Sequence, residues 1–238
     1  MTTTGGGTPR SGTLTEPQVR AMFDRIAGFY DVMNTVMTAG LHHRWRARAA
    51  DLAALRAGDS ALDVACGTGD LAIELSRRVG GDGEVIGSDF AQEMLERARV
   101  KAPALQWDLG NALDLPYASN RFDAATVGFG ARNFSDLDRG LAEMARVVKP
   151  GGRVVVLEIT TPRKPPLSTF YSLWFDRIVP LIGRLTGEEE AYTYLPSSVK
   201  RFPGPEGLAA AMKRSGLRDI HWILTAGGII ALHVGTKA

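Results

Sequence analysis

The sequence has only one cysteine, Cys66, in 238 residues. A single cysteine excludes an intramolecular disulfide and a metal site built from several cysteines, and it suits a reducing compartment. Long apolar runs are also missing, since no stretch approaches the roughly 20 apolar residues of a membrane-spanning helix. The first residues, MTTTGGGTPRSGT, lack the apolar centre of a secretory signal. We therefore expect a cytoplasmic protein in which residues 1–14 form a disordered tail.

A strong excess of one charge is absent as well. The formal net charge is +2 and the basic residues are scattered along the chain. Nucleic-acid binding generally requires a concentrated basic patch, so no nucleic-acid partner is expected. The hydrophobic fraction of 45% is sufficient for one large core. Residues 15–238 are therefore expected to form a single domain.

From residue 60 onward, strand-like and helix-like patterns alternate. This alternation predicts a doubly wound α/β fold, with a parallel sheet covered by helices on both faces. Two helices are expected before the first strand, in residues 15–58, with Thr15 capping the first helix and Gly58 ending the second. The segment LRDIHWILTAGGIIALHVGTK, residues 217–237, predicts two strands about a Gly-Gly turn, which add an antiparallel pair at the edge.

The first predicted strand runs into a glycine-rich turn, LDVACGTGD, at residues 62–70. Gly67 and Gly69 let a ligand approach the backbone, and the following helix presents free N–H groups. Asp89 ends the next strand about 20 residues later, where a carboxylate accepts both hydroxyls of a ribose. These features predict a cofactor that contains adenosine.

Two adenosine cofactors compete for this turn, because Gly67 and Gly69 followed by Ala72 also satisfy the dinucleotide fingerprint. Asp63 lies inside the strand, and a carboxylate there suits the sulfonium and α-ammonium of S-adenosylmethionine better than a pyrophosphate. The alternative is that Asp63 only accepts hydrogen bonds from the backbone of the glycine turn, and both interpretations stay open.

Several segments together resemble the ubiquinone/menaquinone biosynthesis C-methyltransferase family (UbiE/MenG type). The resemblance covers nearly the whole chain after residue 20 and implies a class I S-adenosylmethionine-dependent methyltransferase (Rossmann-like) fold, with a mostly parallel seven-stranded sheet and a C-terminal antiparallel strand. The segments that carry it are MFDRIAGFYDVMN, LDVACGTGDLA, GFGARNF, LAEMARVVKPGGRVVVLEIT, YTYLPSSVKRFP and GGIIALHVGTK.

The resemblance also implies which residues hold the methyl donor. Many members have serine where this chain has Gly128, so a side-chain contact made there does not carry over. With the residues named above, the expected cofactor site comprises Asp63, Gly67, Thr68, Gly69, Asp89, Phe90, Asn111, Ala112 and Gly128.

The implied reaction is methyl transfer to a ring carbon of a prenylated hydroquinone, converting demethylmenaquinol to menaquinol without a metal. Arg132 is expected to stabilise a phenolate or orient a water that takes its proton, because an arginine is a poor base. Asn133 would hydrogen-bond a ring oxygen, which Tyr30 would help to orient. Without the resemblance, Arg132 is interpreted as the partner of a nearby acid and Tyr30 as a core ring.

Other features leave alternatives open. Residues 161–204 are too long for a plain connection and are densely apolar; they cover the substrate, meet a membrane or a second subunit, or simply pack on the sheet. The adjacent His42 and His43 are expected to point apart on a polar surface and not to form a metal pair. The competing functions are a methyltransferase of specialised metabolism with a phenolic or amine acceptor, and a non-enzymatic nucleotide-binding scaffold.

Overall fold

A computed structural model describes residues 14–162, 165, 167–174, 177 and 189–238. Residues 1–13 of the expected tail, and much of the segment 161–204, lie outside these described residues. Leu14 is described, and it packs against the cluster formed by Met22, Ile26 and neighbouring residues.

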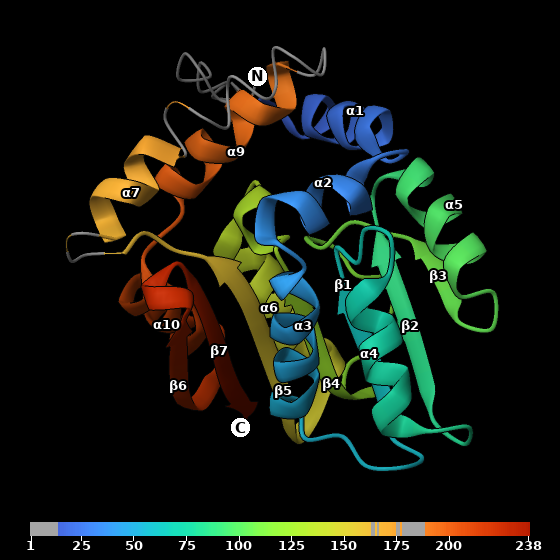
Figure 1. Cartoon of the computed structure of the whole chain (residues 1–238). Coiled ribbons are helices and arrows are strands. Elements are labelled where there is room, and N and C mark those ends of the chain that lie inside the picture. Colours follow the sequence, from blue (N-terminus) through green and yellow to red (C-terminus); the bar gives the residue numbers. More distant parts are fainter. Residues whose placement is uncertain (1–13, 163–164, 166, 175–176, 178–188) are drawn as a thin grey trace, which may run out of the picture.

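The centre of the fold is a seven-stranded sheet with the order β3-β2-β1-β4-β5-β7-β6 (Figure 1). The first five strands pair in parallel, whereas β7 is antiparallel to both of its neighbours. The predicted antiparallel pair and its Gly-Gly turn are therefore confirmed. The strands are β1 (Ser60–Val64), β2 (Glu84–Asp89), β3 (Gln106–Leu109), β4 (Phe122–Gly128), β5 (Val148–Ile159), β6 (Leu217–Thr225) and β7 (Ile230–Lys237).

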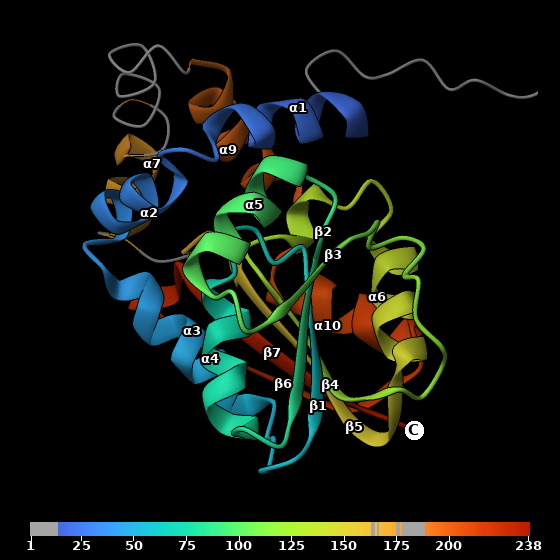
Figure 2. The same ribbon diagram turned by 90° about the vertical axis from the view of Figure 1, so that its right-hand side faces the viewer.

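Helices cover both faces of the sheet (Figure 2). One core cluster lies between the sheet and α6 and α10, and a second lies between the sheet and α3, α4 and α5. Helices α1, α2, α7 and α9 lie beyond the carboxyl ends of the parallel strands (Figure 1). The helices are α1 (Glu16–Ile26), α2 (Tyr30–Thr38), α3 (Leu41–Leu52), α4 (Asp70–Val79), α5 (Gln92–Lys101), α6 (Leu137–Val147), α7 (Leu167–Leu173), α9 (Glu189–Arg201) and α10 (Pro205–Arg214), with short 3-10 turns at Ala131–Asn133 and Ala226–Gly228.

The start of the domain differs from the sequence-based expectation. Three helices precede β1, because α1 ends at Ile26 and Phe29, with non-helical backbone angles (φ −124°, ψ 7°), separates it from α2. Ala39 and Gly40, which are left-handed (φ 49° and 75°), then separate α2 from α3. Helix α3 then ends at Leu52 and not at Gly58, since Ala54 is also left-handed (φ 51°). A non-glycine residue rarely adopts such angles, so Ala54 carried no signal that the helix ends before Gly58. The expected cap of α1 is confirmed: Gln18 Oε1 accepts a hydrogen bond from the Thr15 backbone N–H (2.8 Å).

No helix among the described residues is long and apolar enough to cross a membrane.

Candidate active site

The turn after β1 is fixed to the end of β2 by Asp89. Its Oδ2 accepts a hydrogen bond from the Gly67 N–H (2.8 Å), and its Oδ1 accepts one from the Ala91 N–H (2.9 Å). Burial raises the pKa of Asp89 to about 6, although these backbone donors oppose the rise. Each carboxylate oxygen can accept a second hydrogen bond. Asp89 therefore shapes the glycine turn and still has the capacity to receive ribose hydroxyls.

Asp63 lies beside this turn on β1 and is 1% exposed. Its Oδ1 accepts a hydrogen bond from the Thr126 hydroxyl (2.7 Å), but its Oδ2 is buried and has no hydrogen-bond partner in the described part of the chain. Burial raises the pKa of Asp63 to about 7. A buried carboxylate oxygen without a partner at the wall of a cavity fits the cationic end of S-adenosylmethionine.

Nearly all the residues predicted to hold the cofactor line one cavity at this edge of the sheet. Tyr30 and Asn133 line it too. Gly69 does not: a Cβ atom there would lie 2.3 Å from the Trp107 ring, so this glycine makes room for the tryptophan behind the turn. The predicted cofactor residues in the wall are Asp63, Gly67, Thr68, Asp89, Phe90, Asn111, Ala112 and Gly128.

Glu16 and Arg46 are among the residues of this cavity that were not expected from the sequence. Glu16 of α1 accepts hydrogen bonds from Asn111 Nδ2 (2.7 Å) and the Ser135 hydroxyl (3.1 Å), and thereby holds Asn111 in place. Arg46 of α3 is 6% exposed and also lines the cavity. Glu16 stands next to a helix cap, and Arg46 lies in an arginine-rich helix, so neither position carried a distinct signal.

A second cavity of about 460 Å³ adjoins the first. Phe23, Tyr30 and Phe129 line both cavities, so the two spaces meet at these three rings. Most of the surface lining the second cavity is apolar. Residues from the segment 161–204 contribute to it, namely Tyr171, Trp174, Tyr192, Tyr194 and Leu195.

Arg132 lines the second cavity and is paired with Glu158 at the end of β5. Arg132 Nη1 lies 2.6 Å from Glu158 Oε1 and donates a hydrogen bond to the Phe129 carbonyl (2.6 Å). The two side chains are 8% and 1% exposed. Arg132 thus has the acidic partner that the alternative interpretation expected. The role of Arg132 toward a substrate stays a prediction. Glu158 was missed, although a carboxylate inside an apolar strand is the same kind of signal as Asp63.

Asn133 follows Arg132 in the turn after β4. Its Oδ1 accepts a hydrogen bond from the Tyr194 hydroxyl of α9 (3.0 Å). The Asn133 amide, which lines the first cavity, is therefore oriented by Tyr194, which lines the second.

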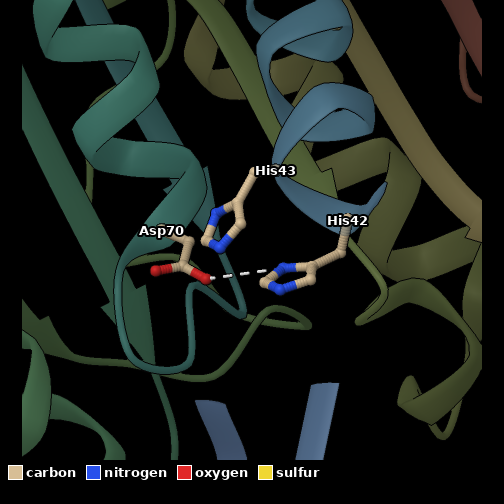
Figure 3. Close-up of side chains that lie close together, drawn as sticks. All are labelled: His42, His43 and Asp70. Carbon is tan, nitrogen blue, oxygen red and sulfur yellow. Dashed lines mark ion pairs between the residues drawn. The ribbon is translucent and has the colours of Figure 1, made fainter. Parts of the chain in front are cut away.

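His42 and His43 lie together with Asp70 near the start of α4 (Figure 3). The expectation that His42 lies on a polar surface is wrong, since it is 1% exposed, and the two rings do not point apart, since their centroids are 3.9 Å apart. Burial, with Arg46 nearby, lowers the pKa of His42 to about 4, and the ring is neutral. Arg46 contacts His42 Nδ1, and Lys101 Nζ lies 2.8 Å from Asp70. Arg46 and Lys101 would repel a metal ion. We therefore interpret the group of His42, His43 and Asp70 as a set of contacts that holds α3 against α4.

Together, the doubly wound sheet, the glycine turn, Asp89 at the end of β2 and the unpaired Oδ2 of Asp63 fit a class I methyltransferase that uses S-adenosylmethionine. Solved structures share the fold, for example a SAM-dependent methyltransferase from Thermotoga maritima (TM-score 0.65, 18% identity, covering 92% of this chain and 99% of that chain). The chain belongs to the ubiE/COQ5 methyltransferase family, whose profile matches residues 12–237. The expected fold class, family and enzyme class are thereby confirmed.

Curated relatives are similar over nearly their whole length. A demethylmenaquinone methyltransferase from Deinococcus radiodurans is 46% identical over 224 residues and covers 92% of each chain. A demethylmenaquinone methyltransferase from Thermus thermophilus is 44% identical over 221 residues, covering 91% of this chain and 100% of the relative.

Proposed function

We propose that this protein methylates a ring carbon of a prenylated hydroquinone, converting demethylmenaquinol to menaquinol. The observation that carries this proposal is the large apolar cavity that meets the methyl-donor cavity at Tyr30 and contains a paired arginine. A quinone ring with an isoprenoid tail is an apolar ligand with a few polar atoms, which is the kind of ligand such a lining suits. The names of the relatives from Deinococcus radiodurans and Thermus thermophilus agree with it.

The donor end of the site is assigned to acidic and polar groups. Asp63 pairs with the cationic end of the cofactor through its partnerless Oδ2, and Asp89 accepts the ribose hydroxyls. Asn111, held by Glu16, faces the adenine. When bound, S-adenosylmethionine supplies the methyl group as an electrophile. The remaining chemistry belongs to the side chains at the acceptor.

An aromatic carbon is a weak nucleophile, and loss of a proton from a ring hydroxyl raises the electron density on the adjacent carbon. Arg132 stabilises the resulting phenolate or orients the water that takes the proton, because its guanidinium can donate but does not act as a base. Its pairing with Glu158 fixes the direction of the guanidinium. Asn133 donates to a ring oxygen through Nδ2, and Tyr30 orients the ring where the cavities meet.

We assign the segment 161–204 to covering the substrate. Tyr171 and Tyr192 support this assignment, because they lie in the wall of the second cavity, which we call the acceptor cavity.

Peripheral contact with a membrane, where a prenylated quinol resides, is supported by helix α2. Val32 and Val36 on this helix are 66% and 72% exposed, and Val36 also lines the acceptor cavity.

Product analysis tests the proposed function. The protein is incubated with methyl-labelled S-adenosylmethionine and a panel of reduced naphthoquinols and benzoquinols, with phenolic and amine compounds as controls. The expected result, by mass spectrometry, is a label on a ring carbon of a prenylated naphthoquinol. Label on an oxygen or nitrogen atom, with no ring methylation, would contradict the proposal.

A further inference from the structure

Lys101 joins three parts of the chain that surround the cofactor cavity. Its Nζ lies 2.5 Å from Asp31 Oδ2 on α2, 2.8 Å from Asp70 Oδ1 at the start of α4, and 3.1 Å from the Thr68 hydroxyl in the glycine turn. Thr68 in turn donates a hydrogen bond to Asp31 Oδ1 (2.5 Å). We call this group of Asp31, Thr68, Asp70 and Lys101 the clasp.

The clasp fastens α2 to the glycine turn at a functional position. Asp31 directly follows Tyr30, which lines both cavities. A Cβ atom on Gly67 would lie 3.9 Å from the Tyr30 ring, so the ring lies against the turn. Any movement of Asp31 away from Thr68 therefore also moves Tyr30 from the point where donor and acceptor meet.

Helix α2 depends on polar contacts more than the other covering helices do. None of its residues is fully buried, whereas α1 buries Val19, Met22 and Ile26. The clasp is shielded from water at one end only: Thr68 is 3% exposed and the Asp70 side chain 13% exposed, whereas the Lys101 and Asp31 side chains are 29% and 40% exposed. The contacts of Lys101 with Thr68 and Asp70 are therefore less weakened by solvent than its contact with Asp31.

The space that α2 covers is also tight. Only about 60 Å³ of the cofactor cavity is open to the centre of a water-sized sphere, which is room for a few water molecules. Phe23 of α1 and Tyr30 of α2 form part of its wall. Of these two covering helices, α2 has no fully buried residue, so its movement requires the smaller loss of packing.

We propose that Asp31 and Lys101 are positioning residues, which hold Tyr30 and α2 closed over the methyl donor and thereby set how fast the spent cofactor leaves. The inference concerns the donor side alone, so it does not depend on the identity of the acceptor.

The test is the dissociation rate of S-adenosylhomocysteine from the full-length protein, measured by stopped-flow tryptophan fluorescence, with Trp107 packed behind Gly69 as a nearby reporter. Lys101→Met is expected to release the ligand about tenfold faster, within the range for coupled side-chain networks. Lys101→Arg keeps the charge and is expected to recover part of the slow release. The matched control is Arg214→Met, which removes an exposed ion pair with Asp138 far from the cavity and should leave the rate unchanged.

The pair is also tested for coupling. Asp31→Asn should speed release as well, and the double variant Asp31→Asn/Lys101→Met should be no faster than Lys101→Met alone, because both changes open the same clasp. Melting temperatures are compared with that of Arg214→Met to exclude general destabilisation. An unchanged dissociation rate in Lys101→Met, or effects of the two substitutions that simply multiply, would overturn the proposal. Because no quinol is present, a wrong acceptor assignment would not affect these results.

Discussion

Replacement of Asp63 by asparagine tests the central electrostatic feature of the donor site. Burial raises the pKa of Asp63 from 3.8 to about 7, so in the cofactor-free protein the ionised form carries a cost on the order of 4 kcal/mol. Asparagine removes this charge and can still accept the Thr126 hydrogen bond. Its amide group at the place of Oδ2 would lack an acceptor, at a cost of about 1–3 kcal/mol. At pH 8 we therefore expect the cofactor-free variant to be more stable than the wild type by roughly 1–3 kcal/mol.

The same substitution should weaken cofactor binding, although it stabilises the protein. Loss of one charge-assisted interaction is worth about 1.5–3 kcal/mol, which corresponds to a loss of affinity of roughly 10- to 150-fold. S-Adenosylmethionine and S-adenosylhomocysteine share the α-ammonium group, so both should lose affinity. Any additional loss for S-adenosylmethionine measures the contribution of the sulfonium.

The pH dependence provides an independent check. Only ionised Asp63 attracts a cation, so the affinity of the wild type should rise with pH until about pH 7, by up to roughly tenfold per pH unit below it. A carboxyl whose pKa is raised by folding stabilises the native state when protonated, so the cofactor-free wild type should lose stability as the pH rises from about 4 to 7. The pH dependence of the cofactor affinity and the pH dependence of the stability should both be smaller in Asp63→Asn.

Isothermal titration calorimetry across pH 6–8 and urea unfolding measure these effects. The control is Asp138→Asn, which changes a carboxylate whose side chain is 55% exposed. If Asp63→Asn binds both ligands like the wild type, or keeps the full pH dependence between pH 6 and 7, Asp63 does not contact the cationic end of the cofactor.

Three further substitutions probe other parts of the site. Asp89→Ala removes the ribose acceptors and should weaken donor binding by about 1.5–3 kcal/mol; an unchanged calorimetric affinity in a folded variant would place the ribose elsewhere. Arg132→Lys keeps the charge but not the planar fork of the guanidinium, so kcat should fall about tenfold or more. The donor affinity, measured in parallel, should stay near the wild-type value. Loss of donor binding instead would show that the role given to Arg132 is wrong. Gly69→Ala should destabilise the protein by about 1–3 kcal/mol more than Gly151→Ala, because both have left-handed angles but only Gly69 has Trp107 within 2.3 Å of the added Cβ; equal urea midpoints would contradict this packing argument.

Much of the fold could be predicted because its signals are local. Parallel strands buried on both faces appear as short apolar runs, and the terminal antiparallel pair was marked by its Gly-Gly turn. The glycine turn and Asp89 could be predicted for the same reason, since strand, turn and helix follow one another in the sequence. The cofactor residues from Asp63 to Gly128 then meet in one cavity because the carboxyl ends of parallel strands lie at one edge.

The remaining features depend on contacts between distant segments. Glu158 lies 26 residues after Arg132, and nothing in the sequence between them predicts that their side chains meet. His42 was misjudged because its burial depends on Arg46 and on packing against α4, which helical spacing alone does not show. Ala54 ends α3 with a left-handed angle (φ 51°) that its residue type does not favour, so no sequence pattern predicted it.

Asp63 and Glu158, two of the buried carboxylates at the carboxyl edge of the sheet, have opposite surroundings, and this difference suits the two proposed ligands. Among the described residues, Asp63 Oδ2 has no hydrogen-bond partner, although Arg46 also lines the donor cavity, so this oxygen can receive a cationic group of the ligand. Glu158 is matched by Arg132, so this ion pair adds no net charge to the acceptor cavity, yet the pair still offers guanidinium N–H groups. A neutral ring with an apolar tail can therefore bind without displacing a counterion. In the role proposed for Arg132, charge that develops on a ring oxygen during the reaction meets donors that Glu158 already holds in position, an arrangement that favours the transition state over the bound quinol.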